Sequence, residues 1–135
     1  MPQATVGVII YKDEAQKDQI LLTKRNVPPF KDQWCLPGGH IEAYETSYDA
    51  VIRECREETG VLVEPLYLGY FDEIFPEQGI HNVALMFYGP VSGEPVEDEH
   101  EVSEIAWFDI NDALSYELAF THNEVLNFFK ELAGL

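Results

Sequence analysis

The most constraining feature of this 135-residue sequence is the stretch from Gly39 to Val61, which reads GHIEAYETSYDAVIRECREETGV. Five of its residues are glutamates, and the spacing of Glu54, Glu57 and Glu58 would place all three on one face of a helix. Like charges three or four residues apart on a helix repel each other by roughly a few tenths of a kcal/mol per pair. We therefore expect a positive partner, either a basic side chain or a bound cation, beside these carboxylates.

The same stretch carries the signals that begin and end a helix. Thr46 is a suitable N-cap with Asp49 three residues later, and the helix should run to about Thr59, with Gly60 in the position that stops it. A 3.6-residue period predicts that one stripe of this helix faces the core. The predicted stripe consists of Tyr48, Val51, Ile52, Cys55 and Thr59.

β-Branched and apolar runs on both sides of this helix predict strands, the first two of which should pair. A final helix is expected over residues 121–132, with Thr121 and Glu124 as its capping box. The order of strands, helix, strands and helix predicts an α/β fold with one domain over residues 1–135, an α/β/α sandwich around a mixed sheet. The predicted strands are 5–11, 20–25, 34–39, 40–42, 61–75, 81–91 and 104–110. Residues 92–104 are a predicted loop, and Asp112 should start a short helical turn. The last helix should bury Val125, Phe128, Phe129 and Leu132.

The charge balance excludes some classes of partner. The net charge is −17, and no basic stripe exists that could bind nucleic acid broadly.

No apolar run is long enough to span a membrane, and the N-terminus lacks the features of a signal peptide. Two isolated cysteines, Cys35 and Cys55, fit a reduced, cytoplasmic protein. The sequence leaves open whether the protein forms a homodimer.

The carboxylates of the central stretch point to metal chemistry. They supply hard oxygen ligands, which select Mg²⁺, Mn²⁺ or Ca²⁺ over zinc, and Mg²⁺ commonly completes its coordination with substrate phosphates. Gly38 and Gly39 allow the backbone to approach a ligand closely. Such a metal would let an acidic protein bind an anionic substrate. The pattern therefore predicts metal-assisted hydrolysis at phosphorus.

The spacing of these residues resembles the Nudix box, G-x5-E-x7-R-E-U-x-E-E-x-G-U, where U is a bulky aliphatic residue. Gly39, Glu45, Arg53, Glu54, Glu57, Glu58, Gly60 and Val61 occupy its fixed positions, and only Cys55 departs, at the first U. A buried thiol packs as a small hydrophobe, so we expect slightly weaker packing there and no loss of catalysis.

The resemblance implies a Nudix hydrolase fold and hydrolysis of a nucleoside diphosphate linked to another group. It implies that Glu54, Glu57 and Glu58 bind Mg²⁺ or Mn²⁺, with a backbone carbonyl of Gly38 or Gly39 as a further ligand. Arg53 would orient the glutamates, and Glu45 would brace Arg53. The general base in this family is either a box glutamate or an acid from a later loop, which here offers Glu97, Asp98, Glu99 and Glu101; we favour Glu101.

Residues outside the box are candidates for substrate contact. Lys24 and Arg25 lie on opposite faces of a predicted strand, so one of them faces solvent and the other could reach a phosphate. Phe30 and Trp34 could stack on a base, although core packing explains Trp34 equally well. The four histidines lack zinc spacing and are interpreted as structural or exposed, with His122 as a possible pocket residue.

The substrate stays open between two classes. The segments PPFKDQWCLPGG and LAFTHNEVL are similar to segments of members that act on ADP-ribose, and we favour ADP-ribose or another nucleoside-diphosphate sugar. GGHIE followed by a helix start also occurs in members that cleave nucleoside triphosphates. A third alternative is a catalytically silent domain that binds a nucleotide and regulates a partner. RNA decapping is disfavoured by the net charge of −17.

Overall fold

The structure is a computed structural model that describes residues 1–96 and 102–135. In chain order the elements are β1 (Gln3–Tyr11), β2 (Gln19–Arg25), β3 (Trp34–Cys35), β4 (Gly38–His40), α1 (Ser47–Thr59), β5 (Leu62–Val63), β6 (Leu66–Phe75), the 3₁₀ turn η1 (Pro76–Gln78), β7 (Ile80–Ser92), β8 (Val102–Asp109), α2 (Ile110–Leu114) and α3 (His122–Leu132). β-Branched and aromatic residues are frequent in the longer strands β1, β6 and β8, as their preference for a pleated, half-buried surface predicts.

β1 is the centre of a mixed sheet. It runs parallel to β7 along its whole length, from Gln3 opposite Asn82 to Tyr11 opposite Pro90, and antiparallel to β2 and β4. β7 also pairs with β6 and β5, and β2 pairs with β3 and β8. The predicted pairing of the first two strands is confirmed, although β2 makes most of its ladder with β8.

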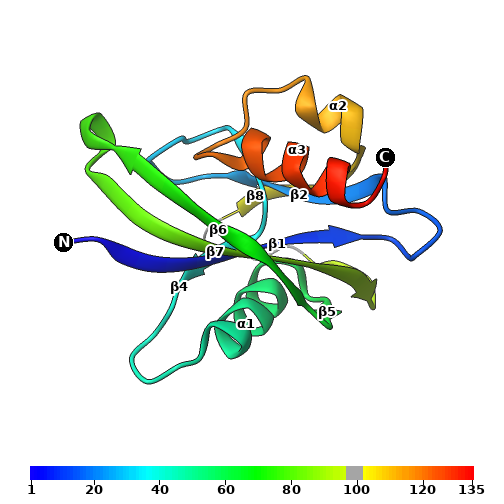
Figure 1. The fold of residues 1–135 in the computed structure, drawn as a ribbon, viewed down its shortest axis with the longest axis horizontal. Coiled ribbons are helices and arrows are strands. Elements are labelled where there is room, and N and C mark those ends of the chain that lie inside the picture. Colours follow the sequence, from blue (N-terminus) through cyan, green and yellow to red (C-terminus); the bar gives the residue numbers. More distant parts are fainter. Residues whose placement is uncertain (97–101) are drawn as a thin grey trace.

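Two apolar cores lie on opposite faces of this sheet. Figure 1 shows α1 on one face and α2 with α3 on the other. Alternation along β1 sends Ile9 and Tyr11 into the core below α3, and Val8 and Ile10 into the core against α1. The predicted α/β/α sandwich with a mixed sheet is therefore confirmed. Within residues 1–96 and 102–135, no helix is long and apolar enough to cross a membrane.

α1 begins and ends where its capping signals predict. The Thr46 hydroxyl accepts a hydrogen bond from the backbone N–H of Asp49 at 3.1 Å. Gly60 adopts the left-handed conformation, with φ 72°, and donates its N–H to the carbonyl of Arg56. These local interactions hold the helix at a fixed position along the chain, and with it the three glutamates.

The buried stripe of α1 is rotated relative to the predicted one. Val51, Cys55 and Thr59 are fully buried, as expected, but Tyr48 is 48% exposed and the prediction for it is wrong. Ala50 is buried instead, because the sheet covers the side of the helix that carries the glutamates. The rotation brings Glu54 and Glu58 out of solvent and against the sheet.

α3 shows a comparable rotation. Phe128 and Leu132, two of the four predicted core residues, are exposed, so these two predictions are wrong. Thr121 occupies the N-cap but makes no capping hydrogen bond through its side chain, so the capping box with Glu124 is also wrong. The buried residues of α3 are His122, Val125, Leu126 and Phe129.

β8 starts within the predicted loop of residues 92–104. Val102 is already paired with Arg25 of β2, across an irregularity in the ladder. The strand ends at Asp109, whose side chain caps α2 by accepting a hydrogen bond from the backbone N–H of Asn111. The predicted helical turn is therefore confirmed, beginning at Ile110 in place of Asp112.

Candidate active site

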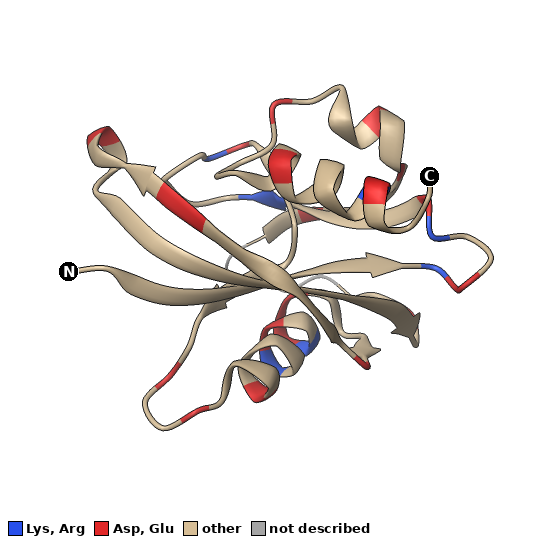
Figure 2. Cartoon of the chain, in the orientation of Figure 1, with Lys and Arg blue, Asp and Glu red and all other residues tan. Residues whose placement is uncertain are grey.

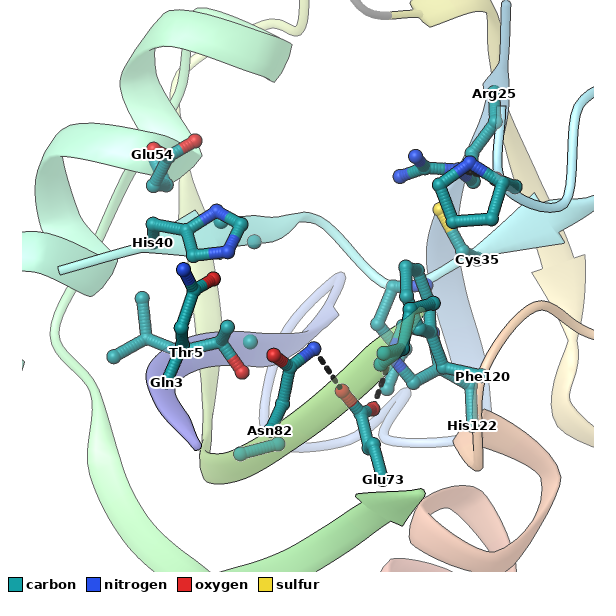
Figure 3. Close-up of a pocket in the computed structure, with 18 of the residues that line it drawn as sticks. Gln3, Thr5, Arg25, Cys35, His40, Glu54, Glu73, Asn82, Phe120 and His122 are labelled. Atoms are coloured by element: carbon teal, nitrogen blue, oxygen red, sulfur yellow. Dashed lines mark hydrogen bonds and ion pairs between the residues drawn. The ribbon is translucent and has the colours of Figure 1, made fainter. Parts of the chain in front are cut away.

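A cavity of about 570 Å³ lies between α1, the sheet and the segment that leads into α3. Figure 3 shows Glu54 and His40 on one side of it, and Glu73 with His122 on another. Arg25 reaches toward the same space from β2. Pockets of this volume typically bind small molecules in proteins. The cavity is thus lined both by residues of the box and by residues that lie far from it in the sequence.

Glu54 and Glu58 place two carboxylates at one end of this cavity. Both line it, and both are more than 90% buried in spite of their charge. Glu58 accepts a hydrogen bond from the backbone N–H of Gly38 at 3.0 Å. Glu57 points elsewhere, since its side chain is half exposed and does not line the cavity. The three box glutamates therefore differ strongly in their exposure.

Gly39 lets the backbone of β4 approach Glu54. A Cβ at this position would lie 2.6 Å from the carboxylate carbon and from Oε1 of Glu54, so any side chain there would push the carboxylate out of its place. The expected need for glycine at Gly39 thus has a steric cause. A backbone peptide of β4 and a buried carboxylate share one small space, and both are oxygen donors.

Arg53 is the cation that partners most of the acidic residues of the box. Its Nε and Nη2 donate to both oxygens of Glu45 at 2.7 and 2.9 Å. Its Nη1 contacts Glu54 at 2.9 Å and Glu57 at 3.2 Å. Hydrogen bonds from Arg53 and the backbone of Glu42 lower the pKa of Glu45 to about 2. The structure thus contains the pairing of Glu45 with Arg53 that the resemblance implied.

The donor set fits a hard divalent cation by its chemistry. Glu54, Glu58 and the β4 backbone offer only oxygen, which suits Mg²⁺ or Mn²⁺. Within the part of the chain that the structure describes, no three acidic, histidine or cysteine side chains converge in the manner of a metal cluster. The carboxylate of Glu57 is turned toward Arg53, at 3.2 Å.

Arg25 is the basic candidate that lines the cavity. Its Nε donates to the carbonyl of Pro29 at 2.7 Å, and its guanidinium lies 5.0 Å from the centroid of the Phe120 ring. These contacts hold the guanidinium in one orientation while leaving it charged. Figure 2 shows that basic residues are sparse over the fold, so Arg25 stands out as a cation beside this cavity.

Three predicted substrate contacts lie outside the cavity lining. Lys24 is 3.9 Å from Glu104 and lies over the ring of Trp34. Trp34 packs edge-on against Phe108 next to the core, and Phe30 packs against Phe120. The packing of Trp34 agrees with the alternative that the sequence left open, which is a place in the core in place of stacking on a base. A role in substrate binding stays a prediction for all three, whereas Gly38 lines the cavity.

Comparison with known proteins identifies the family. The family model described as NUDIX domain matches residues 1–129. The chain belongs to the Nudix family. It is 35% identical over 127 residues to an ADP-ribose pyrophosphatase of Methanocaldococcus jannaschii, covering 93% of this chain and 71% of that protein. The chain is thus a hydrolase, and the predicted family and enzyme class are confirmed.

Solved structures share the Nudix fold. A MutT Nudix hydrolase from Burkholderia pseudomallei is 32% identical, with a TM-score of 0.85 and coverage of 94% of this chain and 97% of that chain. The Nudix domain of Shewanella oneidensis NrtR, solved with ADP ribose, has the same TM-score of 0.85 at 23% identity, and covers 98% of this chain and 88% of that chain. The second likeness concerns the fold alone.

Cys55 is the residue that departs from the Nudix box. It is fully buried in the core against α1, and its thiol lies 3.4 Å from the carbonyl of Val61, to which it donates. Burial raises the pKa of this thiol to about 11, so it stays protonated at neutral pH. The residue packs as the small hydrophobe expected at this position.

Glu101, our candidate for the general base, lies outside the described residues of this Nudix hydrolase, as do Glu97, Asp98 and Glu99. Its role stays a prediction. Sequence reasoning also missed two cavity residues, Glu73 and Asn82, which are the buried polar positions of neighbouring strands. A lone glutamate in an apolar strand is the signal that could have pointed to Glu73.

Proposed function

We propose that this Nudix hydrolase cleaves a phosphoanhydride in a small nucleoside diphosphate derivative, with ADP-ribose or another nucleoside-diphosphate sugar as the substrate class. The observation that carries this proposal is one cavity lined both by the box carboxylates Glu54 and Glu58 and by the cation Arg25. The 35% identity to an ADP-ribose pyrophosphatase supports this substrate class over a nucleoside triphosphate.

We also propose that the reaction depends on Mg²⁺ or Mn²⁺, held by Glu54, Glu57, Glu58 and a backbone carbonyl of Gly39. Support comes from the all-oxygen donor set and from the close approach of β4 to Glu54. When bound, such a metal polarises a phosphoryl oxygen and offsets the charge of the phosphates. Glu57 would have to turn from Arg53 to join this set.

The remaining residues of the site would position these groups. Arg53 holds the carboxylates of Glu54 and Glu57 through one nitrogen, while Glu45 holds Arg53 through the other two. Arg25 would bind phosphate charge within the cavity. For the general base we keep Glu101, with a box glutamate as the alternative; either would take a proton from the attacking water.

A substrate panel tests this function. The purified protein is incubated with Mg²⁺ and ADP-ribose, other nucleoside-diphosphate sugars or nucleoside triphosphates, and the phosphate products are resolved. We expect AMP and ribose 5-phosphate from ADP-ribose. Release of pyrophosphate from a triphosphate with no reaction on ADP-ribose would move the assignment to the alternative class. Tight binding of one nucleotide without any turnover would indicate the silent regulatory domain.

Glu57→Gln tests the metal assignment within the same assay. Loss of a charged ligand should reduce kcat/KM by at least about 100-fold, because even residues that only support metal ligands are worth about 10- to 100-fold. Glu131→Gln, an exposed change of the same kind on α3, should leave activity unchanged. Full activity of Glu57→Gln would contradict the metal assignment.

Two finer expectations remain proposals. Both cysteines are free and buried, which supports a reducing, cytoplasmic location. The possible homodimer would have an apolar surface to use, because β6 exposes Leu66, Tyr67, Tyr70 and Ile74. Sedimentation of the purified protein would show whether two copies associate.

A further inference from the structure

A second polar cluster lies in the cavity, away from the box glutamates. It consists of Glu73 on β6, Asn82 on the facing residue of β7, and His122 at the start of α3. All three line the cavity, and their exposed fractions are 3%, 7% and 6%. Figure 3 shows Glu73 between Asn82 and His122, with its carboxylate pointing toward both.

His122 is an uncharged neighbour of Glu73. The Nδ1 of His122 accepts from the backbone N–H of Leu36 at 3.0 Å, so a neutral ring carries its proton on Nε2, which is 3.9 Å from Glu73. Burial, followed by the charge of Arg25, lowers the pKa of His122 to about 3. The ring is therefore neutral at physiological pH, and its Nε2–H faces the carboxylate without adding charge.

A buried carboxylate in this setting costs stability. Burial raises the pKa of Glu73 above its ordinary value, although hydrogen bonds from Asn82 and the backbone of Thr121, and the charge of Arg25, act in the opposite direction. Asn82 donates to one carboxylate oxygen at 3.2 Å, whereas His122 Nε2 lies 3.9 Å from the other, beyond hydrogen-bond distance, so these two neighbours give an incomplete reason for a buried charge. A ligand that hydrogen-bonds to the carboxylate supplies such a reason.

The cluster presents acceptors to the cavity. Asn82 uses its amide nitrogen on Glu73, at 3.2 Å, which leaves its side-chain oxygen as an acceptor. A carboxylate has two oxygens and about four acceptor sites. The matching ligand group therefore carries adjacent donors. A nucleoside offers two candidates: the vicinal diol of its ribose, with two adjacent hydroxyl donors, and the amino group of its base, with two N–H donors on one nitrogen.

We propose that Glu73 and Asn82 form a specificity-determining pair that binds adjacent hydrogen-bond donors of the nucleoside moiety, at the part of the cavity away from Glu54 and Glu58. This inference rests on the proposed function for the identity of the substrate. The phosphates then lie between the pair and the box, within reach of Arg25, which lines the same cavity.

Substrate analogues and one isosteric variant test the pair. The wild type and Glu73→Gln are assayed with ADP-ribose, with its 2′-deoxyadenosine analogue, and with its hypoxanthine analogue, which lacks the amino group. We expect the wild type to lose about 10- to 100-fold in kcat/KM on one analogue, the size of one hydrogen bond to a charged group. The affected analogue identifies the diol or the base as the bound donor.

Glu73→Gln should lose a similar factor on ADP-ribose, mainly through a higher KM, and should no longer distinguish the affected analogue. Asp72→Asn is the matched control, because it removes one carboxylate from the exposed neighbouring position of β6 and should behave as the wild type. A Glu73→Gln enzyme that keeps the KM and the analogue preference of the wild type overturns the proposal.

Thermal unfolding separates this role from a structural one. The raised pKa means that Glu73 binds a proton more tightly in the folded protein than in the unfolded chain. The stability that Glu73 contributes is therefore present below its unfolded pKa and is lost as the pH rises through its folded pKa. Glu73→Gln should therefore unfold at the same or a higher temperature than the wild type at pH 8. A lower unfolding temperature with unchanged KM would mean that Glu73 is structural, against the proposal.

The pair can be tested even if the proposed function is wrong, and the two failures can be told apart. If the wild type does not act on ADP-ribose, the comparison is made with the panel member of highest kcat/KM, or of tightest binding, and with its deoxyribose and altered-base analogues. The pair is then supported or overturned by the same loss of discrimination in Glu73→Gln, whichever nucleotide is used.

Discussion

Glu45 supports the box through its hydrogen bonds to Arg53, and neither of these two residues lines the cavity. Glu45→Gln should lower kcat/KM by about 10- to 100-fold, because Arg53 would lose one half of its bidentate partner and hold Glu54 and Glu57 less firmly. Glu42→Gln, at 3.6 Å from Arg53 and more exposed, is the control and should have a smaller effect. Equal activity of the two variants would argue against a positioning role for Glu45.

The pKa of Glu45 adds a pH dependence to this prediction. Because its folded pKa is depressed to about 2, its stabilising contribution is present above its unfolded pKa and is lost as pH falls toward 2. The difference in unfolding temperature between the wild type and Glu45→Gln should therefore shrink on acidification. Unfolding scans between pH 7 and pH 2.5 would measure it, and a difference that stays constant would contradict the assignment.

Residues with local partners were predictable, and residues with distant partners were not. The pairing of Arg53 with Glu45 follows from the box, because both lie on one short segment. Glu73 meets His122 only after β6 and α3 are folded onto the same sheet. No spacing in the sequence indicates that contact, so the meeting of these two residues in one cavity could not be foreseen.

At the scale of elements, the N-cap of α1 should carry a measurable share of the stability. Thr46→Ala should lower the free energy of unfolding by about 1 kcal/mol, because it removes the acceptor for the backbone N–H of Asp49. Thr46→Ser keeps the hydroxyl and should retain most of that stability. Urea unfolding measures both, and equal losses in the two variants would show that the hydroxyl is not the cause.

The start and end of α1 were predictable because capping depends on neighbours within one helical turn. The side of a helix that becomes buried depends on the layer that covers it. Tyr48 and Phe128 fit an apolar stripe equally well in sequence, yet the sheet leaves both about half exposed. In α1 this rotation buries Glu54 and Glu58 and places Glu54 against the backbone of β4.

At the scale of the whole molecule, the charge of −17 should make stability sensitive to the bound cation. Saturating Mn²⁺ should raise the unfolding temperature, with about 2.7 kcal/mol of stabilisation at a free concentration of 100 times Kd. NaCl at matched ionic strength controls for general screening. Glu57→Gln should lose the part of the shift that exceeds the NaCl control. The same Mn²⁺-specific shift in both proteins would place the cation elsewhere.

The parallel ladder between β1 and β7 bears on how this chain emerges from a ribosome. β1 is made first, yet its partner along its whole length is β7, which is synthesised only after α1 and β6. A nascent chain that ends before β7 therefore leaves one edge of this buried, apolar strand with unpaired N–H and C=O groups facing solvent. This edge of β1 stays open until β7 is complete at Ser92, so this protein should depend on protection of its first strand during translation.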